Sequence, residues 1–242
     1  AFLCFPAQGF NTISAIGAIA GTITGTTFET DSTLYLVSFA VLIISTAIIS
    51  FGGIKKVTKV TDVIVPFMAV IYVVTAFLLI VFNFKLIPWF FEAVFTQAFK
   101  PDAVFGGAFG LALSQGIKRG LMSNEAGQGT ITMPAAAAHV KHPCEQGCVQ
   151  AIGVFLDTIV VCTLTGFVVI LGRMWLSNDA QAWFELGKLE KFLTSCGALT
   201  GNSGLYTPVT LAVSVCFGLF AYTCLLGFMS FTEMCANRIS SS

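Results

Sequence analysis

Residues 103–143 read AVFGGAFGLALSQGIKRGLMSNEAGQGTITMPAAAAHVKHP. The stretch begins with a charge-free apolar run over 103–117, which is followed by a dense group of charged, amide and glycine residues. Charged side chains near the centre of a bilayer cost at least ~2.5–3.5 kcal/mol each on insertion scales, so they mark pathways or binding sites. Glycine lets the backbone leave the helical conformation, and the freed peptide groups need polar partners. We therefore predict a membrane helix over 103–140 that is broken near 118–129.

A helix interrupted at membrane depth is the best sequence indication of a transporter's binding site. The interruption contains Gly120, Ser123, Asn124 and Gly127, which we predict to bind substrate. A zwitterionic amino acid needs N–H donors for its carboxylate and oxygen acceptors for its ammonium group. The N-terminal end of the second half-helix offers partial positive charge for the carboxylate. The alternative is a structural kink whose polar groups cap one another.

The charged residues of the interruption, Lys118, Arg119 and Glu125, allow two interpretations. They form a gating or coupling network, or they form a buried ion pair that allows the interruption to exist. We favour the structural interpretation. Because a buried ion pair contributes little net stability, such a pair would be retained for conformational specificity.

The composition is that of a membrane protein. Of the 242 residues, 56% are hydrophobic and only 10% are charged, whereas soluble domains carry about 25% charged residues. The 12 Lys and Arg residues balance the 12 Asp and Glu residues, so nothing favours nucleic acid as a partner. A zinc site formed by His139, His142, Cys144 and Cys148 is disfavoured because their spacing matches no common zinc motif. No Ser/His pair, paired aspartates or metal cluster has convincing spacing for an enzyme.

Charge-free runs of about 20 residues, the length that crosses ~30 Å of hydrocarbon, predict an all-α integral membrane protein with about six spans. The predicted spans cover residues 1–27, 34–53, 63–84, 103–140, 146–172 and 207–234. Two amphipathic segments, 88–99 and 179–195, are predicted to lie in the membrane interface. Pro66 is expected in the first turn of its span, where the missing N–H costs little.

Basic residues indicate how the spans are oriented. They follow the second, fourth and sixth spans as Lys55, Lys56, Lys59, Lys141 and Arg238. By the positive-inside rule these spans end in the cytoplasm, so the fifth span ends outside.

The predicted fifth span carries its polar residues, Gln146, Gln150 and Asp157, on one helical face. We expect this face to meet protein rather than lipid. An isolated carboxylate in a membrane span is protonated or bound to a cation. The alternative for Asp157 is a hydrogen bond that packs this span against a neighbouring one.

Four segments resemble the signature of the alanine/glycine:cation symporter family. They are KRGLMSNEAGQGT (118–130), PAAAAH (134–139), HPCEQG (142–147) and VFLDT (154–158). The resemblance implies a leucine-transporter-like inverted-repeat fold and a multi-pass protein of the plasma (inner) membrane. It implies sodium-coupled symport of alanine or glycine, with sodium as the coupling ion and no cofactor. It covers about residues 1–237, without the family's first broken helix and last spans, so we expect an internal fragment.

The resemblance also assigns residues outside the interruption. Asn11 matches a polar position of the family and is expected to contact substrate, although its spacing from Gln8 departs from the usual pattern. Three residues match positions that complete a sodium site in the family. They are Phe220, through its carbonyl, Thr223 and Cys224. The family usually has a hydroxyl residue where Cys224 stands, and sodium prefers oxygen to sulfur. The alternatives are proton-coupled transport and a non-transporting membrane scaffold or sensor.

Overall fold

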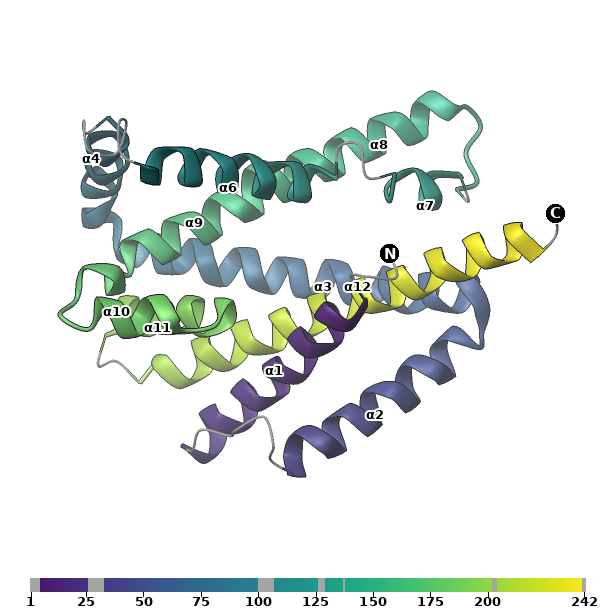
Figure 1. Cartoon of the computed structure of the whole chain (residues 1–242), viewed down its shortest axis with the longest axis horizontal. Coiled ribbons are helices and arrows are strands. Elements are labelled where there is room, and N and C mark those ends of the chain that lie inside the picture. Colours follow the sequence, from purple (N-terminus) through teal and green to yellow (C-terminus); the bar gives the residue numbers. More distant parts are fainter. Residues whose placement is uncertain are drawn as a thin grey trace. The chain divides into compact units, whose positions relative to one another are not determined.

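The computed structural model describes residues 5–25, 33–99, 107–125, 129–136, 138–201 and 204–240. This part of the chain is built from helices and turns and contains no strand (Figure 1). Contacts divide it into two compact units. One combines the residues up to Thr75 with those from Met174 onward, and the other is Ala76–Arg173.

The first unit is organised around the contact between its first and last helices. Its elements are α1 (Phe5–Thr24), α2 (Thr33–Ser50), most of α3 (Gly53–Phe82), η4 (Met174–Leu176), α10 (Ala180–Glu185), α11 (Lys188–Thr200) and α12 (Tyr206–Ser240). α1 packs along α12, and α2 contacts both. Ile13, Leu42 and Leu225, one from each of these helices, form a buried cluster. Burying such side chains contributes roughly 1.5–3 kcal/mol each in water, and close packing supplies the contacts that hold helices together in lipid.

The second unit contains the interrupted helix. Its elements are the end of α3, η2 (Phe84–Leu86), α4 (Ile87–Ala98), α6 (Gly107–Asn124), α7 (Thr132–Ala136), α8 (Pro143–Phe155), η3 (Leu156–Val161) and α9 (Cys162–Leu171). η3 is a π-helical turn that joins α8 to α9. The three therefore form one span with a local bulge.

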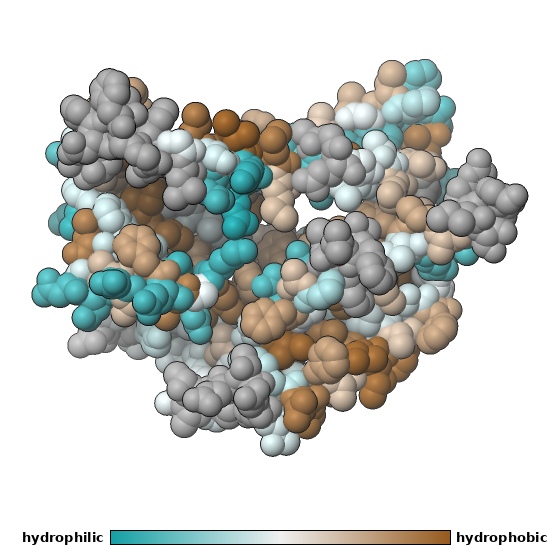
Figure 2. Space-filling model, viewed as in Figure 1, coloured by the Kyte–Doolittle hydropathy of each residue, from teal (hydrophilic) through white to brown (hydrophobic). Residues whose placement is uncertain are grey.

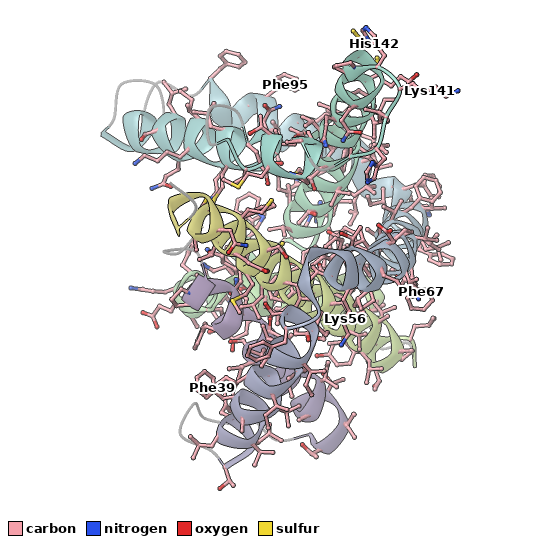
Figure 3. The ribbon with its side chains drawn as sticks, turned by 90° about the vertical axis from the view of Figure 1, so that its right-hand side faces the viewer. Phe39, Lys56, Phe67, Phe95, Lys141 and His142 are labelled. Atoms are coloured by element: carbon pink, nitrogen blue, oxygen red, sulfur yellow. The ribbon has the colours of Figure 1, made fainter. Side chains whose placement is uncertain are left out.

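Four described helices are long and apolar enough to cross a membrane, namely Thr33–Ser50, Lys56–Phe82, Pro143–Leu176 and Tyr206–Asn237. Their outer faces are apolar: Figure 2 shows a hydrophobic surface over α2, and Figure 3 shows Phe39 and Phe67 pointing away from the ribbon. The all-α membrane class predicted from the sequence is confirmed. α1 and α6, which lie in predicted spans, are outside this group of four because polar residues in α1 and polar and charged residues in α6 lower their hydropathy.

The segment with three lysines before the predicted third span is helical, because α3 begins at Gly53. Gly53 has φ +71°, a conformation that favours glycine and separates α2 from α3. No glycine or proline follows until Pro66, so helix forms without interruption. Pro66 therefore lies inside α3 and not in its first turn. Lys56 lies in this early part of α3, and its Nζ donates to the carbonyl of Ile48 at 3.0 Å, near the end of α2.

The predicted amphipathic segment 179–195 forms two helices rather than one. α10 ends at Glu185 and α11 begins at Lys188, where Gly187 is the N-cap residue and its N–H donates to the carboxylate of Glu190 at 2.9 Å. The apolar stripe of this segment points inward, as Trp183, Leu189 and Phe192 are buried. The division falls at Leu186 and Gly187, where the backbone leaves the helical conformation with ψ 151° and 163°.

Cys196, in α11, provides a test of this packing. Burial raises the pKa of the Cys196 thiol to about 12, because the thiolate is disfavoured away from water. Since the thiolate is the reactive form, we expect a maleimide near neutral pH to leave native Cys196 unmodified. Exposed Cys144 and Cys148 serve as reactive controls. Peptide mass spectrometry should find Cys196 modified only after denaturation, and rapid native labelling would contradict its buried position.

Candidate functional site

The interruption of the helix begins at Glu125. α6 ends at Asn124, and Glu125 has φ +55°, which places its backbone in the left-handed region. Such a conformation costs a residue with a side chain on the order of 1–3 kcal/mol. The hydroxyl of Thr130 donates to Oε2 of Glu125 at 2.7 Å, and Gly129 has φ +74°. The glutamate side chain therefore joins the end of α6 to Thr130, which lies two residues before α7.

The favoured ion pair of Glu125 with Lys118 or Arg119 is absent from the described structure. Both cations are exposed on α6, and no described group pairs with either of them. The reason is geometric, because the left-handed turn at Glu125 carries its carboxylate to Thr130. The gating interpretation of Lys118 and Arg119 stays a prediction.

The side chain of Ser123 links the end of α6 to the π-helical turn by hydrogen bonds. Its hydroxyl donates to Oδ2 of Asp157 at 2.9 Å. The hydroxyl oxygen of Ser123 also lies 3.3 Å from the hydroxyl oxygen of Thr158 and 3.4 Å from the thiol sulfur of Cys162. Two residues selected from different parts of the sequence thus meet, across 34 positions of the chain.

The π-helical turn explains why Asp157 and Cys162 both approach Ser123. In this turn the N–H of Cys162 donates to the carbonyl of Asp157, five residues earlier. One extra residue per turn rotates the following side chains, and π bulges are frequent at functional sites. The sequence carries no proline or glycine within Leu156–Val161 that signals this turn. Sequence reasoning therefore selected Asp157 but missed Thr158 and Cys162.

Asp157 is itself exposed, and Ser123 is half-buried. Other predicted residues of this unit lie on α6 and α8. Gly120 and Asn124 are exposed on α6, while Gln150 is half-buried on α8. Gly127 lies outside the described residues. No described atom lies within 4 Å of the position that a Cβ would take on Gly120, so that side of α6 is free in the second unit.

In the first unit, Asn11 lines a cleft of about 1240 Å³. Its Nδ2 donates to Oε1 of Gln8 at 3.3 Å, and the carbonyl oxygen of its side chain has no described donor. Ser14 and Tyr35 line the same cleft, together with the start of α11. Sequence reasoning missed this wall of α11. The row of small residues on α1 is the sequence feature that indicates this cleft, because small side chains leave space beside the helix.

The residues predicted to bind sodium lie on α12. The hydroxyl of Thr223 donates to the carbonyl of Phe220 at 3.0 Å, and Thr223 is buried. These two oxygens are hard ligands of the kind that sodium accepts. Cys224 is exposed and offers only sulfur. Among the described residues, no group of three or more His, Cys, Asp or Glu gathers that could hold another metal ion.

Known proteins resemble this chain along most of its length. The profile of the sodium:alanine symporter family matches residues 2–242. The sodium/alanine symporter AgcS of Methanococcus maripaludis is 36% identical over 234 residues, which are 97% of this chain and 49% of that protein. The sodium/proton-dependent alanine carrier protein of Bacillus sp. strain PS3 is 48% identical over 120 residues, 50% of this chain and 27% of that protein. The protein named probable sodium/glutamine symporter GlnT, of Bacillus subtilis, is 36% identical over 179 residues, 74% of this chain and 35% of that protein. The chain thus spans half or less of the length of these relatives.

Proposed function

Since this chain belongs to the sodium:alanine symporter family, we propose that it serves sodium-coupled symport of a small neutral amino acid, alanine or glycine. The protein would lie in the plasma membrane, with lipid around its apolar spans. The family is one of symporters and not of enzymes, so no covalent step is required. The observation that carries the proposal is the hydrogen bond from Ser123, at the end of the interrupted helix, to Asp157 in the π-helical turn.

The Ser123–Asp157 pair supports transport because both groups can exchange partners. A carboxylate that accepts one hydroxyl retains oxygen lone pairs for a cation or for a substrate ammonium group. Asp157 is exposed and Ser123 is half-buried, so the carboxylate is accessible to such a ligand. Binding of the cation and the amino acid would therefore change how the end of α6 is held on η3.

Sodium would bind as co-transported substrate at hard oxygen ligands. The carbonyl of Phe220 and the hydroxyl of Thr223 would supply two of them. Sodium needs more ligands than two, which other parts of the whole protein or water would supply. Cys224 would contribute poorly, since its sulfur is a soft ligand.

The coupling would follow from alternating access. A ligand shifts a conformational equilibrium only by its differential affinity for the two states. Sodium and amino acid bound together would favour the state that passes the substrate inward, and the sodium gradient would supply the free energy. Lys118, Arg119 and Glu125 would act in gating, beside the interrupted helix.

The test uses the full-length protein reconstituted in liposomes. We expect labelled alanine to accumulate with an inward sodium gradient and not with choline in place of sodium. Unlabelled glycine should compete. Glutamine is included as a competitor because one relative is named as a probable sodium/glutamine symporter. Competition by glutamine but not by glycine would contradict the proposed substrate.

A second experiment separates sodium from proton coupling, because one relative is named sodium/proton-dependent. Uptake driven by a proton gradient without sodium would replace the proposed coupling ion. Absence of uptake of alanine, glycine and glutamine under every gradient would favour the membrane scaffold or sensor.

A further inference from the structure

Arg173 follows the end of α9 in a backbone conformation that is unusual for arginine. Its φ is +55°, in the left-handed region where glycine normally ends a helix. The N–H of Gly172 donates to the carbonyl of Val168 at 3.0 Å, and that of Arg173 donates to Ile170 at 3.2 Å. These bonds anchor the backbone of Arg173. The direction in which its side chain leaves the helix is therefore constrained.

The guanidinium group of Arg173 lies over the indole ring of Trp89, 4.0 Å from the ring centre. Trp89 belongs to α4, which contacts α9 (Figure 1). Phe90 of α4 stacks on Phe167 of α9 with ring centres 3.9 Å apart. The indole ring beneath the guanidinium thus belongs to the packed contact between α4 and α9, two helices of the same unit.

Stacking occupies the face of the guanidinium but leaves its edge open. Arginine presents five N–H donors in the plane of the group, and these form the fork that recognises planar or tetrahedral anions. Within the described part of the chain, the Arg173 side chain has neither a hydrogen bond nor an ion pair. An exposed, oriented cation that no described anion pairs with therefore lies beside Trp89.

The surroundings of this pair are those of a membrane interface. Arg173 is the first cation after the apolar part of the Pro143–Leu176 span. Tryptophan is enriched at headgroup level. On α4, Phe91 and Phe95 are 48% and 59% exposed, and Figure 3 shows Phe95 pointing away from the ribbon. The N–H edge of the Arg173 guanidinium and an exposed apolar surface of α4 thus both lie at the contact between α4 and α9.

We propose that Arg173 and Trp89 form a binding site for the phosphate group of a phospholipid, whose acyl chains lie along the exposed apolar face of α4. The oriented guanidinium would hold the phosphate by two parallel hydrogen bonds. The exposed phenylalanines favour a lipid over free phosphate, because only a lipid covers apolar surface. The proposal rests on insertion of this unit in a membrane and not on the substrate that is transported. The bound lipid would hold α4 against α9.

The test is native mass spectrometry of the full-length protein, released from mild detergent after incubation with phosphatidylglycerol. We expect Arg173→Gln and Trp89→Leu to lower retained lipid about tenfold, the change that one charged interaction of this kind produces. Lys85→Gln is the matched control, since Lys85 is an exposed cation in η2 just before α4. It should retain the lipid at the wild-type level.

Two further arms identify the ligand and control for folding. Arg173→Lys keeps the charge but removes the planar fork, so it should fold with the wild-type unfolding temperature and still lose most of the lipid. Inorganic phosphate should not displace the lipid at matched concentration. Wild-type retention by Arg173→Gln, equal loss in Lys85→Gln, or displacement by inorganic phosphate would each overturn the proposal.

Discussion

Asp157→Asn in the full-length protein is expected to reduce sodium-driven alanine uptake on the order of 100-fold, because losing an interaction with a charged group costs up to about 3 kcal/mol, roughly two factors of ten. Asparagine keeps an oxygen that can accept from Ser123, so the hydrogen bond at 2.9 Å can survive. What is removed is the negative charge beside the π-helical turn. The measurement is initial uptake rate against sodium concentration, in liposomes that contain equal amounts of protein.

The control variants separate charge from hydrogen bonding. Ser123→Ala removes the donor and keeps the carboxylate, so it should weaken uptake less, about tenfold, without abolishing sodium dependence. Glu145→Gln removes an exposed acid from the first turn of α8 and should transport normally. Uptake by Asp157→Asn within twofold of wild type would refute the functional role of Asp157. The helix-packing alternative would then be favoured.

Thr223→Ala is expected to raise the half-maximal sodium concentration about tenfold, because it removes a hard oxygen ligand from α12. Thr223→Ser keeps the hydroxyl that donates to Phe220 and should behave like the wild type. Cys224→Ser should lower the half-maximal concentration, since a hydroxyl replaces a soft sulfur. The measurement is alanine uptake across a sodium series at constant ionic strength.

One outcome would contradict the sodium site on α12. If neither Thr223→Ala nor Cys224→Ser changes the sodium dependence, cation binding lies elsewhere. Thr223 would then act only through its hydrogen bond to the carbonyl of Phe220, which satisfies a buried hydroxyl. Thermal unfolding of Thr223→Ala distinguishes these cases from misfolding, because loss of a single hydrogen bond costs only about 0.5–1.5 kcal/mol.

Several features of this protein were determined by local sequence. Long apolar runs predicted helices because a bilayer requires every backbone group to be bonded within its own segment. The group of charges and glycines after residue 117 predicted that α6 would end, and the helix ends at Asn124. The signature around Ser123 identified the family. These features are local, since they depend on residue type and spacing within one helix.

Other features were decided only by tertiary structure. The bond between Ser123 and Asp157, the π-helical turn that orients Cys162, and the stacking of Arg173 on Trp89 join groups that are distant in sequence or depend on helix rotation. Glu125 has the charge to pair with Lys118, yet a left-handed turn directs it to Thr130. Periodicity predicts which face of a helix is apolar. The neighbour that each polar group meets depends on how helices pack, and no local pattern specifies that packing.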